Sequence, residues 1–151
     1  SRFLTLTKGN GVINRLFHSY GKYTGDMEGR RNGALISMAS GKAVAFAIFN
    51  LQARGEMFVT HNDPVYEGMI VGLSSKSGDL EINVMKGKQL TNMRTQGTDE
   101  NVVLTPVRAM AIAEQLSMLN SDESLEITPK SCRLRKSMLS PHDRKRKSKA
   151  S

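Results

Sequence analysis

Apolar and polar side chains alternate most regularly in residues 80–85, where the sequence LEINVM places Leu, Ile and Val at every second position. A period of two is typical of a β-strand with one buried face. Less regular apolar stretches predict further strands at residues 12–20, 34–40, 42–47, 56–60, 66–75, 124–129 and 131–136. Turns are expected at Ser40-Gly41 and in the sequence HNDP at residues 61–64.

The clearest helical segment is TPVRAMAIAEQLSMLNSD, residues 105–122. Its interior is rich in Ala, Met, Leu, Glu and Gln, which favour helices. Thr105 is suited to cap the helix, and Pro106 is suited to its first turn. We therefore expect the main helix of the protein to begin here.

Two shorter helices are also predicted. Residues 46–55 favour a short helix with Gly55 at its C-terminal cap. Residues 140–150 begin with a capping Ser140, carry Asp143 in the first turn and then five basic residues, so their charges suit a helix dipole. The whole pattern predicts an α+β fold with mostly antiparallel strands, a few short helices and a long basic loop before the main helix.

The composition fits one domain whose core is aliphatic and rich in methionine. The chain has 151 residues, 38% of them hydrophobic and only 5% aromatic, with nine Met and no Trp. No apolar run approaches the roughly 20 residues of a membrane helix, and we expect no signal peptide. The single Cys132 has no partner for an internal disulfide, which favours a reducing, cytoplasmic compartment.

The formal net charge of +8 is concentrated near the end of the chain. Residues 129–151 hold nine basic side chains and one acidic residue, Asp143, whereas the 13 basic and 13 acidic groups of residues 1–128 cancel. A basic block of this kind favours nucleic acid or another anionic surface as partner. The alternative is a solvated terminus without a binding role.

Motifs for bond-making chemistry are missing. The sequence Gly-Lys occurs three times, but none of the three has the earlier glycine and the following Ser or Thr of a phosphate-binding loop. The three histidines are far apart in the sequence, and we interpret His61 and Asp63 as parts of a hydrogen-bonded surface turn. We therefore expect no enzymatic activity, no cofactor and no metal site in this chain.

Residues 86–101 lie between the last alternating strand and the main helix, and they have no periodicity. The cations Lys86, Lys88 and Arg94 suit phosphates, and Asn92 and Gln96 suit sugars or base edges. A connection of this length in a compact domain is uncommon and is often functional. The segment is interpreted as a finger that enters structured RNA, with a plain surface loop as the alternative.

Three stretches carry a family resemblance. GKQLTNMRTQGTDE, RRNGALISMASGKAVAFAIFNLQARGEMFVTHNDPVYEGMIVG and LEITPKSCRLRK are similar to the C-terminal region of the BipA/TypA family of translational GTPases. The resemblance implies that residues 1–23 are the end of a domain similar to the fifth domain of elongation factor G. It also implies that residues 24–151 form the BipA/TypA-type C-terminal domain.

The resemblance implies a bacterial cytoplasmic protein that binds GTP and the ribosome and acts in stress response, virulence regulation and ribosome assembly. In that family the C-terminal domain lies on the large subunit near the A site, and the loop approaches ribosomal RNA and the tRNA acceptor end. GTP and Mg are expected only in an N-terminal domain. Neither a membrane nor a small-molecule substrate is expected as partner.

The predicted RNA contacts fall into two groups. The first lies in the loop, at Lys86, Lys88, Gln89, Asn92, Arg94 and Gln96. The second would bind the domain to ribosomal RNA through Arg133, Arg135, Lys136, Arg144, Lys145, Arg146 and Lys147. A different function remains open: a protein-interaction module that docks on a ribosomal protein or regulator through methionine-rich surfaces.

Overall fold

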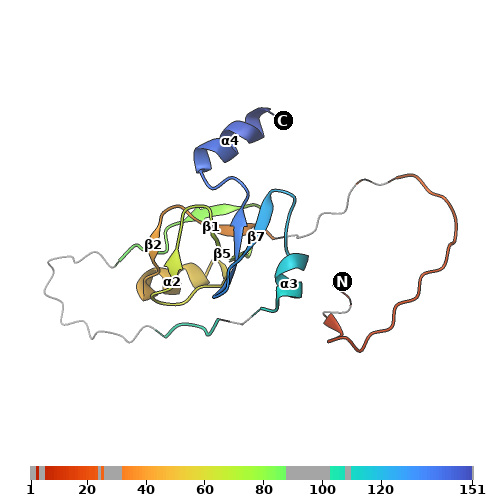
Figure 1. Ribbon diagram of the computed structural model, residues 1–151, viewed down its shortest axis with the longest axis horizontal. Helices are drawn as coiled ribbons and strands as arrows, with labels where there is room; N and C mark the ends of the chain where they lie inside the picture. Colours follow the sequence, from red (N-terminus) through yellow and green to blue (C-terminus); the bar gives the residue numbers. More distant parts are fainter. Residues whose placement is uncertain are drawn as a thin grey trace, which may run out of the picture.

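The structure is a computed structural model, and it describes residues 3, 6–23, 25, 32–87, 103–107 and 110–150. Its centre is a sheet with the strand order β3 (Gly55–Met57), β5 (Ile70–Ser74), β1 (Ala34–Ser37) and β6 (Leu80–Ile82), seen in Figure 1. β5 runs antiparallel to β1 and β3, whereas β6 runs parallel to β1.

Side chains of the central strand β1 alternate between two cores. Leu35 packs with Val71 in one apolar cluster, whereas Ala34 and Ile36 pack with Leu134 in another. Successive side chains of a strand point to opposite faces of its sheet. Because both faces are covered, all four residues of β1 are buried.

One face of the sheet is covered by α2 (Ala45–Gln52) and by the short strand pair β2 (Gly41–Lys42) and β4 (Pro64–Val65). The first amide of α2, that of Ala45, donates a hydrogen bond of 3.2 Å to Nδ1 of His61. Asp63 accepts a bond of 2.7 Å from the amide of Thr60 in the same turn. The interpretation of His61 and Asp63 as parts of a hydrogen-bonded surface turn is therefore confirmed.

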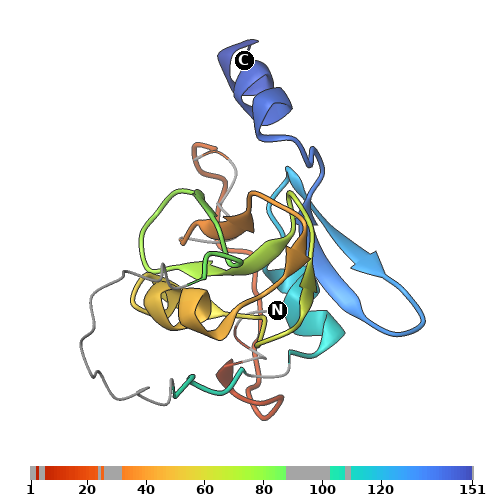
Figure 2. The ribbon, with the colours of Figure 1, turned by 90° about the vertical axis from the view of Figure 1, so that its left-hand side faces the viewer.

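The other face carries the antiparallel hairpin β7 (Glu123–Ile127) and β8 (Cys132–Lys136) together with α3 (Ile112–Ser117). Figure 2 shows the hairpin and α3 across the sheet from α2. The backbone amide of Lys136 donates to the carbonyl of Gly68, at 2.9 Å, and this bond joins β8 to the segment before β5. The predicted α+β class and the two predicted strands are confirmed, and the structure pairs these strands as a hairpin.

The last helix, α4 (Pro141–Ala150), follows β8 and stands apart from the sheet in Figures 1 and 2. Its connection passes Gly68, whose φ of +83° belongs to the left-handed region that favours glycine. A Cβ at Gly68 would lie 2.6 Å from the Cα of Leu139. Glycine is therefore needed where the chain turns out of the hairpin toward α4.

The main helix is shorter than predicted. α3 begins at Ile112, and Thr105 is not its cap. Instead, the backbone carbonyl of Thr105 accepts a hydrogen bond of 3.3 Å from the side-chain amide of Gln52 in α2, and its backbone amide donates one of 3.4 Å to the same side chain. Because these bonds satisfy the amide and carbonyl of Thr105 outside a helix, the helical propensity of the segment does not decide its structure there.

Three further predictions from the sequence are wrong. Gly55 is not a helix cap but the first residue of β3, where an added Cβ would meet the carbonyl oxygen of Leu73 at 1.9 Å. The predicted strand at residues 42–47 is limited to β2, and α2 begins at Ala45. Residues 12–20 form no strand, since no described strand pairs with them. The predicted long basic loop, residues 86–101, lies largely outside the described residues.

Candidate nucleic-acid interface

α4 is a helix without an apolar stripe, and its sequence PHDRKRKSKA is dominated by cations. Asp143 lies in the first turn, whereas Lys147 and Lys149 lie in the last, so both charge signs favour the helix dipole. Lys145, Arg146, Lys147 and Lys149 are exposed to solvent. The predicted basic helix is confirmed as a structural element, and its surface is cationic.

The cations of α4 lie on two sides of the helix. Arg144, Lys145 and Lys147 line a cleft of about 750 Å³ between α4 and the rest of the fold. Arg146 and Lys149 are not among the residues that line it, and at helical spacing they share the opposite face. Arg146 lies 3.5 Å from Asp143 within the same helix, and its side chain is 85% exposed.

Arg144 joins α4 to the sheet. Its Nη2 lies 3.0 Å from Oε1 of Glu81 in β6, and its Nη1 donates to the carbonyl oxygens of Met138 and Leu139. Only 15% of its side chain is exposed. Hydrogen bonds between charged groups are stronger than neutral ones. Arg144 therefore positions the helix, and its guanidinium is already occupied by protein oxygens.

Lys136 has a structural position that its sequence does not suggest. Its side chain is 2% exposed, and Nζ lies 2.5 Å from Asp79, 2.8 Å from Asp122 and 3.0 Å from Glu123. A buried ammonium surrounded by three carboxylates is not accessible to a phosphate. The prediction of Lys136 as an RNA contact is therefore wrong, because its charge is used to join β8 to the turn before β6.

The carboxylates also determine the protonation of Lys136. Burial alone would lower the pKa of this ammonium, but its hydrogen bonds to Asp122, Asp79 and Glu123 outweigh burial and raise the pKa above its ordinary value. Lys136 therefore remains charged throughout the physiological range. It is a cation that holds the hairpin in place.

The two arginines of β8 lie on the other side of that strand. Arg133 lies 3.8 Å from Glu126, and about 30% of its side chain is exposed. Glu126 also accepts a hydrogen bond of 2.5 Å from the hydroxyl of Tyr66. Burial and this bond raise the pKa of Tyr66 to about 12, although Arg135 and Arg133 act in the opposite direction. Arg135 is half-buried.

The loop contributes one described cation. Lys86 is exposed, just after β6 and close to the end of the described segment at Gly87. The other predicted loop contacts, Lys88, Gln89, Asn92, Arg94 and Gln96, lie outside the described residues. Within the described part of the chain, the exposed cations of α4 are therefore the candidate interface.

Sequence reasoning missed the acidic partners of the basic residues. Glu81, Asp79, Asp122 and Glu123 decide which of the cations face solvent. Alternation within β8 offers one signal, since Leu134 and Lys136 share a face and Leu134 is a core residue. Among the described residues, no group of three or more His, Cys, Asp or Glu is placed to hold a metal ion.

The described segments also contain no helix that is both long and apolar enough to cross a membrane. The fold and its cationic surface define a small α+β module with a projecting basic helix. The sequence model of the TypA/BipA C-terminal domain matches residues 32–141, and the chain belongs to this family.

Curated relatives extend well beyond this chain. A protein of Buchnera aphidicola subsp. Schizaphis graminum, named large ribosomal subunit assembly factor BipA, is 49% identical over 97% of this chain and 24% of its own length. Proteins of the same name from Escherichia coli K12 and Salmonella typhimurium are each 47% identical, over 99% and 97% of this chain. The chain thus spans about a quarter of the length of these relatives.

Proposed function

We propose that this chain is the RNA-binding C-terminal module of a ribosome-associated translational GTPase and docks on ribosomal RNA of the large subunit. The single observation that carries the proposal is the helix α4, which stands apart from the sheet in Figure 1 and carries exposed cations. Lys and Arg side chains supply the electrostatic part of nucleic-acid binding by displacing counterions from phosphates.

The structure supports two roles for the basic residues, since some are placed to contact phosphates and others hold the fold together. Arg146 and Lys149 lie on the face of α4 opposite the cleft, and they are the best-placed phosphate contacts. Arg144 positions the helix through Glu81, and Lys136 holds the hairpin that leads into it. Arg144 and Lys136 thus hold the helix and the hairpin in place, whereas the exposed cations of α4 bind phosphates.

The finer details of the proposal rest on family membership. The relatives are named as large ribosomal subunit assembly factors, and we extend this partner to the present chain. In this proposal the domain docks near the A site in the cytoplasm, and the basic loop at residues 86–101 reaches ribosomal RNA and the tRNA acceptor end. GTP and Mg are bound by a part of the longer protein outside this chain.

A protein-docking module is the competing function. The hypothesis relied on methionine-rich surfaces, but Met57 and Met69 lie in the apolar core. Met38 and Met138 are exposed, at 47% and 41%. The described methionines therefore include core residues as well as surface residues, and they favour the protein-docking function less than the exposed cations favour RNA.

Co-sedimentation with purified large ribosomal subunits tests the proposal. The test variant carries Arg146→Glu and Lys149→Glu, and the matched control carries Lys42→Glu and Lys76→Glu at exposed positions of the body. Both variants change the net charge by the same amount. The proposal predicts that the α4 variant loses binding and the control retains most of it. Equal loss in both would indicate unspecific attraction.

A third protein lacks residues 87–97 and tests the loop separately. The proposal predicts weaker binding for this deletion as well, because the loop carries further cations. If binding survives both the deletion and the α4 variant and persists at high salt, the competing protein-docking function is supported instead.

A further inference from the structure

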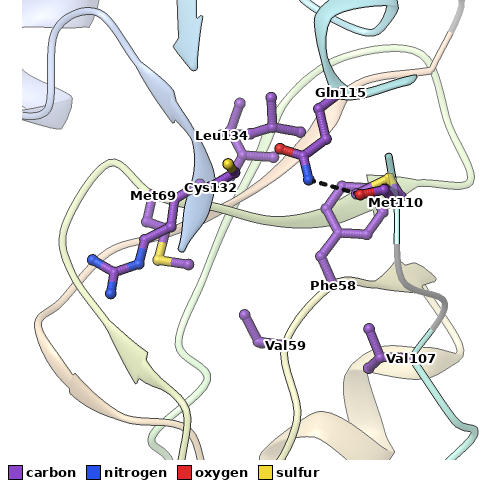
Figure 3. Close-up of a pocket in the computed structure, with 10 residues that line it drawn as sticks. Phe58, Val59, Met69, Val107, Met110, Gln115, Cys132 and Leu134 are labelled. Atoms are coloured by element: carbon purple, nitrogen blue, oxygen red, sulfur yellow. Dashed lines mark hydrogen bonds between the residues drawn. The ribbon is translucent and has the colours of Figure 1, made fainter. Parts of the chain in front are cut away.

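A second feature of the fold is independent of the cationic helix. A cavity of about 170 Å³ lies between α3, β8 and the segment that follows β3. Figure 3 shows the side chains around it, which include Phe58, Met69, Met110, Cys132 and Leu134. Val107 is 36% exposed and Cys132 is half-buried, so the cavity is bordered by side chains that reach solvent.

One polar side chain points into this apolar space. Gln115 of α3 is 9% exposed, and its Nε2 donates a hydrogen bond of 3.2 Å to the carbonyl oxygen of Met110. Among buried side-chain oxygens and nitrogens of the described residues, Oε1 of Gln115 is the one without a hydrogen-bond partner. Leaving a buried acceptor without a donor is unfavourable, so a ligand that donates to it gains a hydrogen bond that the empty cavity lacks.

The orientation of the amide is determined by its neighbour. A carbonyl oxygen can only accept, so the group of Gln115 that faces Met110 must be its NH₂. The oxygen is then directed away from Met110, toward the side of Leu134 and Cys132 in Figure 3. The cavity consequently presents one strong acceptor in otherwise apolar surroundings.

Size and charge restrict what can enter. An apolar protein cavity of about 150 Å³ is large enough for benzene, so this cavity suits a single ring. Phe58 and the sulfur atoms of Met69 and Met110 are good partners for an aromatic ring. The guanidinium of Arg133 pairs with Glu126, so the cavity offers no reason to select an anion.

We propose that this cavity binds a compact neutral ring with one hydrogen-bond donor, of the phenol class, whose O–H donates to Oε1 of Gln115. Such a ring can come from a free small molecule or from a Tyr side chain of a protein partner. The proposal does not depend on RNA binding, since none of the exposed cations of α4 lines the cavity.

The test compares p-cresol with toluene, which has the same carbon frame without the hydroxyl. Each is titrated into the 151-residue chain while backbone amide resonances are followed by NMR. We expect p-cresol to bind about 3–10-fold more tightly than toluene, the factor that corresponds to one net hydrogen bond. The perturbed amides should be those of the cavity, such as Phe58, Met110 and Leu134.

The variant Gln115→Met removes the acceptor while keeping a side chain of similar length. In this variant toluene should bind at least as tightly as p-cresol. The variant Cys132→Leu adds side-chain volume beside the cavity and should weaken both ligands. Dispersed amide spectra establish that each variant is folded, and the second variant keeps the proposal testable if the first one does not fold.

N-acetyl-tyrosinamide distinguishes the two sources of the ring. If it binds with the same perturbed amides as p-cresol, a protein side chain can reach the cavity; if only p-cresol binds, the natural ligand is a free molecule. Two results would overturn the proposal. One is that neither p-cresol nor toluene perturbs the amide resonances of the cavity, as expected for a site filled by water alone. The other is a p-cresol preference that Gln115→Met leaves unchanged.

Discussion

Nζ of Lys136 lies 3.0 Å from Oε1 of Glu123, and both side chains are almost fully removed from solvent, at 2% and 0% exposure. The pair belongs to two neighbouring strands of one hairpin, and Asp79 and Asp122 complete the shell around the ammonium. A residue that the sequence places in a basic RNA-binding run is thus a buried structural cation. Buried, ion-paired basic residues of this chain must therefore be distinguished from exposed ones before any of them is assigned a role in RNA binding.

Replacing Lys136 should destabilise the fold strongly. Lys136→Met leaves three carboxylates without their cation, and breaking a buried ion pair from one side typically costs about 3–5 kcal/mol. Urea unfolding at neutral pH measures the loss. The matched control is Lys149→Met, which removes an exposed cation and should change the free energy of unfolding by less than about 0.5 kcal/mol. Equal stability of the two variants would contradict the structural role of Lys136.

The contribution of Lys136 should depend on pH only in the alkaline range. Its pKa in the folded state is raised above the ordinary value of 10.5, so the folded state holds the proton more tightly than the unfolded state. The stabilisation is therefore complete below pH 10.5 and is lost as the pH rises through the raised pKa. The difference in unfolding free energy between wild type and Lys136→Met should be constant from pH 7 to 9.5 and shrink above pH 10.5. A difference that shrinks between pH 5 and 8 would contradict this assignment.

Tyr66 should ionise unusually late. Burial and the hydrogen bond to Glu126 raise its pKa to about 12, and both favour the neutral phenol. The ultraviolet absorbance of tyrosinate, recorded as wild type minus Tyr66→Phe, should give a midpoint near pH 12. Glu126→Gln removes the carboxylate but leaves the burial, so it should lower the midpoint only in part. A midpoint unaffected by Glu126→Gln would show that the carboxylate does not act on this phenol.

The ion pair between Arg144 and Glu81 permits a test in which general electrostatics and a positioning role predict opposite changes in RNA affinity. Glu81→Gln removes a negative charge, so general electrostatics predicts tighter binding to ribosomal RNA. The structure predicts weaker binding, because α4 loses the carboxylate that positions it. Hydrogen exchange should also become faster in residues 142–149, since the helix loses an ion pair that joins it to the sheet. Tighter binding with unchanged exchange would refute a positioning role for Arg144.

Local patterns in the sequence were sufficient for several elements. The alternation of LEINVM predicted β6, and the two apolar stretches around Pro129 predicted the strands β7 and β8. The charges of residues 140–150 predicted α4. These elements depend on side chains close to one another in the chain, so their signals are local.

Long-range contacts decided the rest. The ammonium of Lys136 is held in part by Asp79, and nothing in a basic run of sequence indicates that contact. Thr105 remains outside α3 because Gln52, from another helix, satisfies its backbone groups. Gly55 is needed for its close approach to Leu73 in the neighbouring strand rather than for a helix end. In each case a residue distant in sequence determines the local structure.

The most direct test of the central claim is the salt dependence of binding to large ribosomal subunits for wild type and for Arg146→Gln with Lys149→Gln. Each lost phosphate contact should reduce the slope of log K against log salt concentration by about 0.7–0.9. We predict that the double variant binds more weakly and that its slope is smaller by roughly 1.4–1.8. The same slope and affinity as wild type would contradict the claim that the outer face of α4 binds RNA.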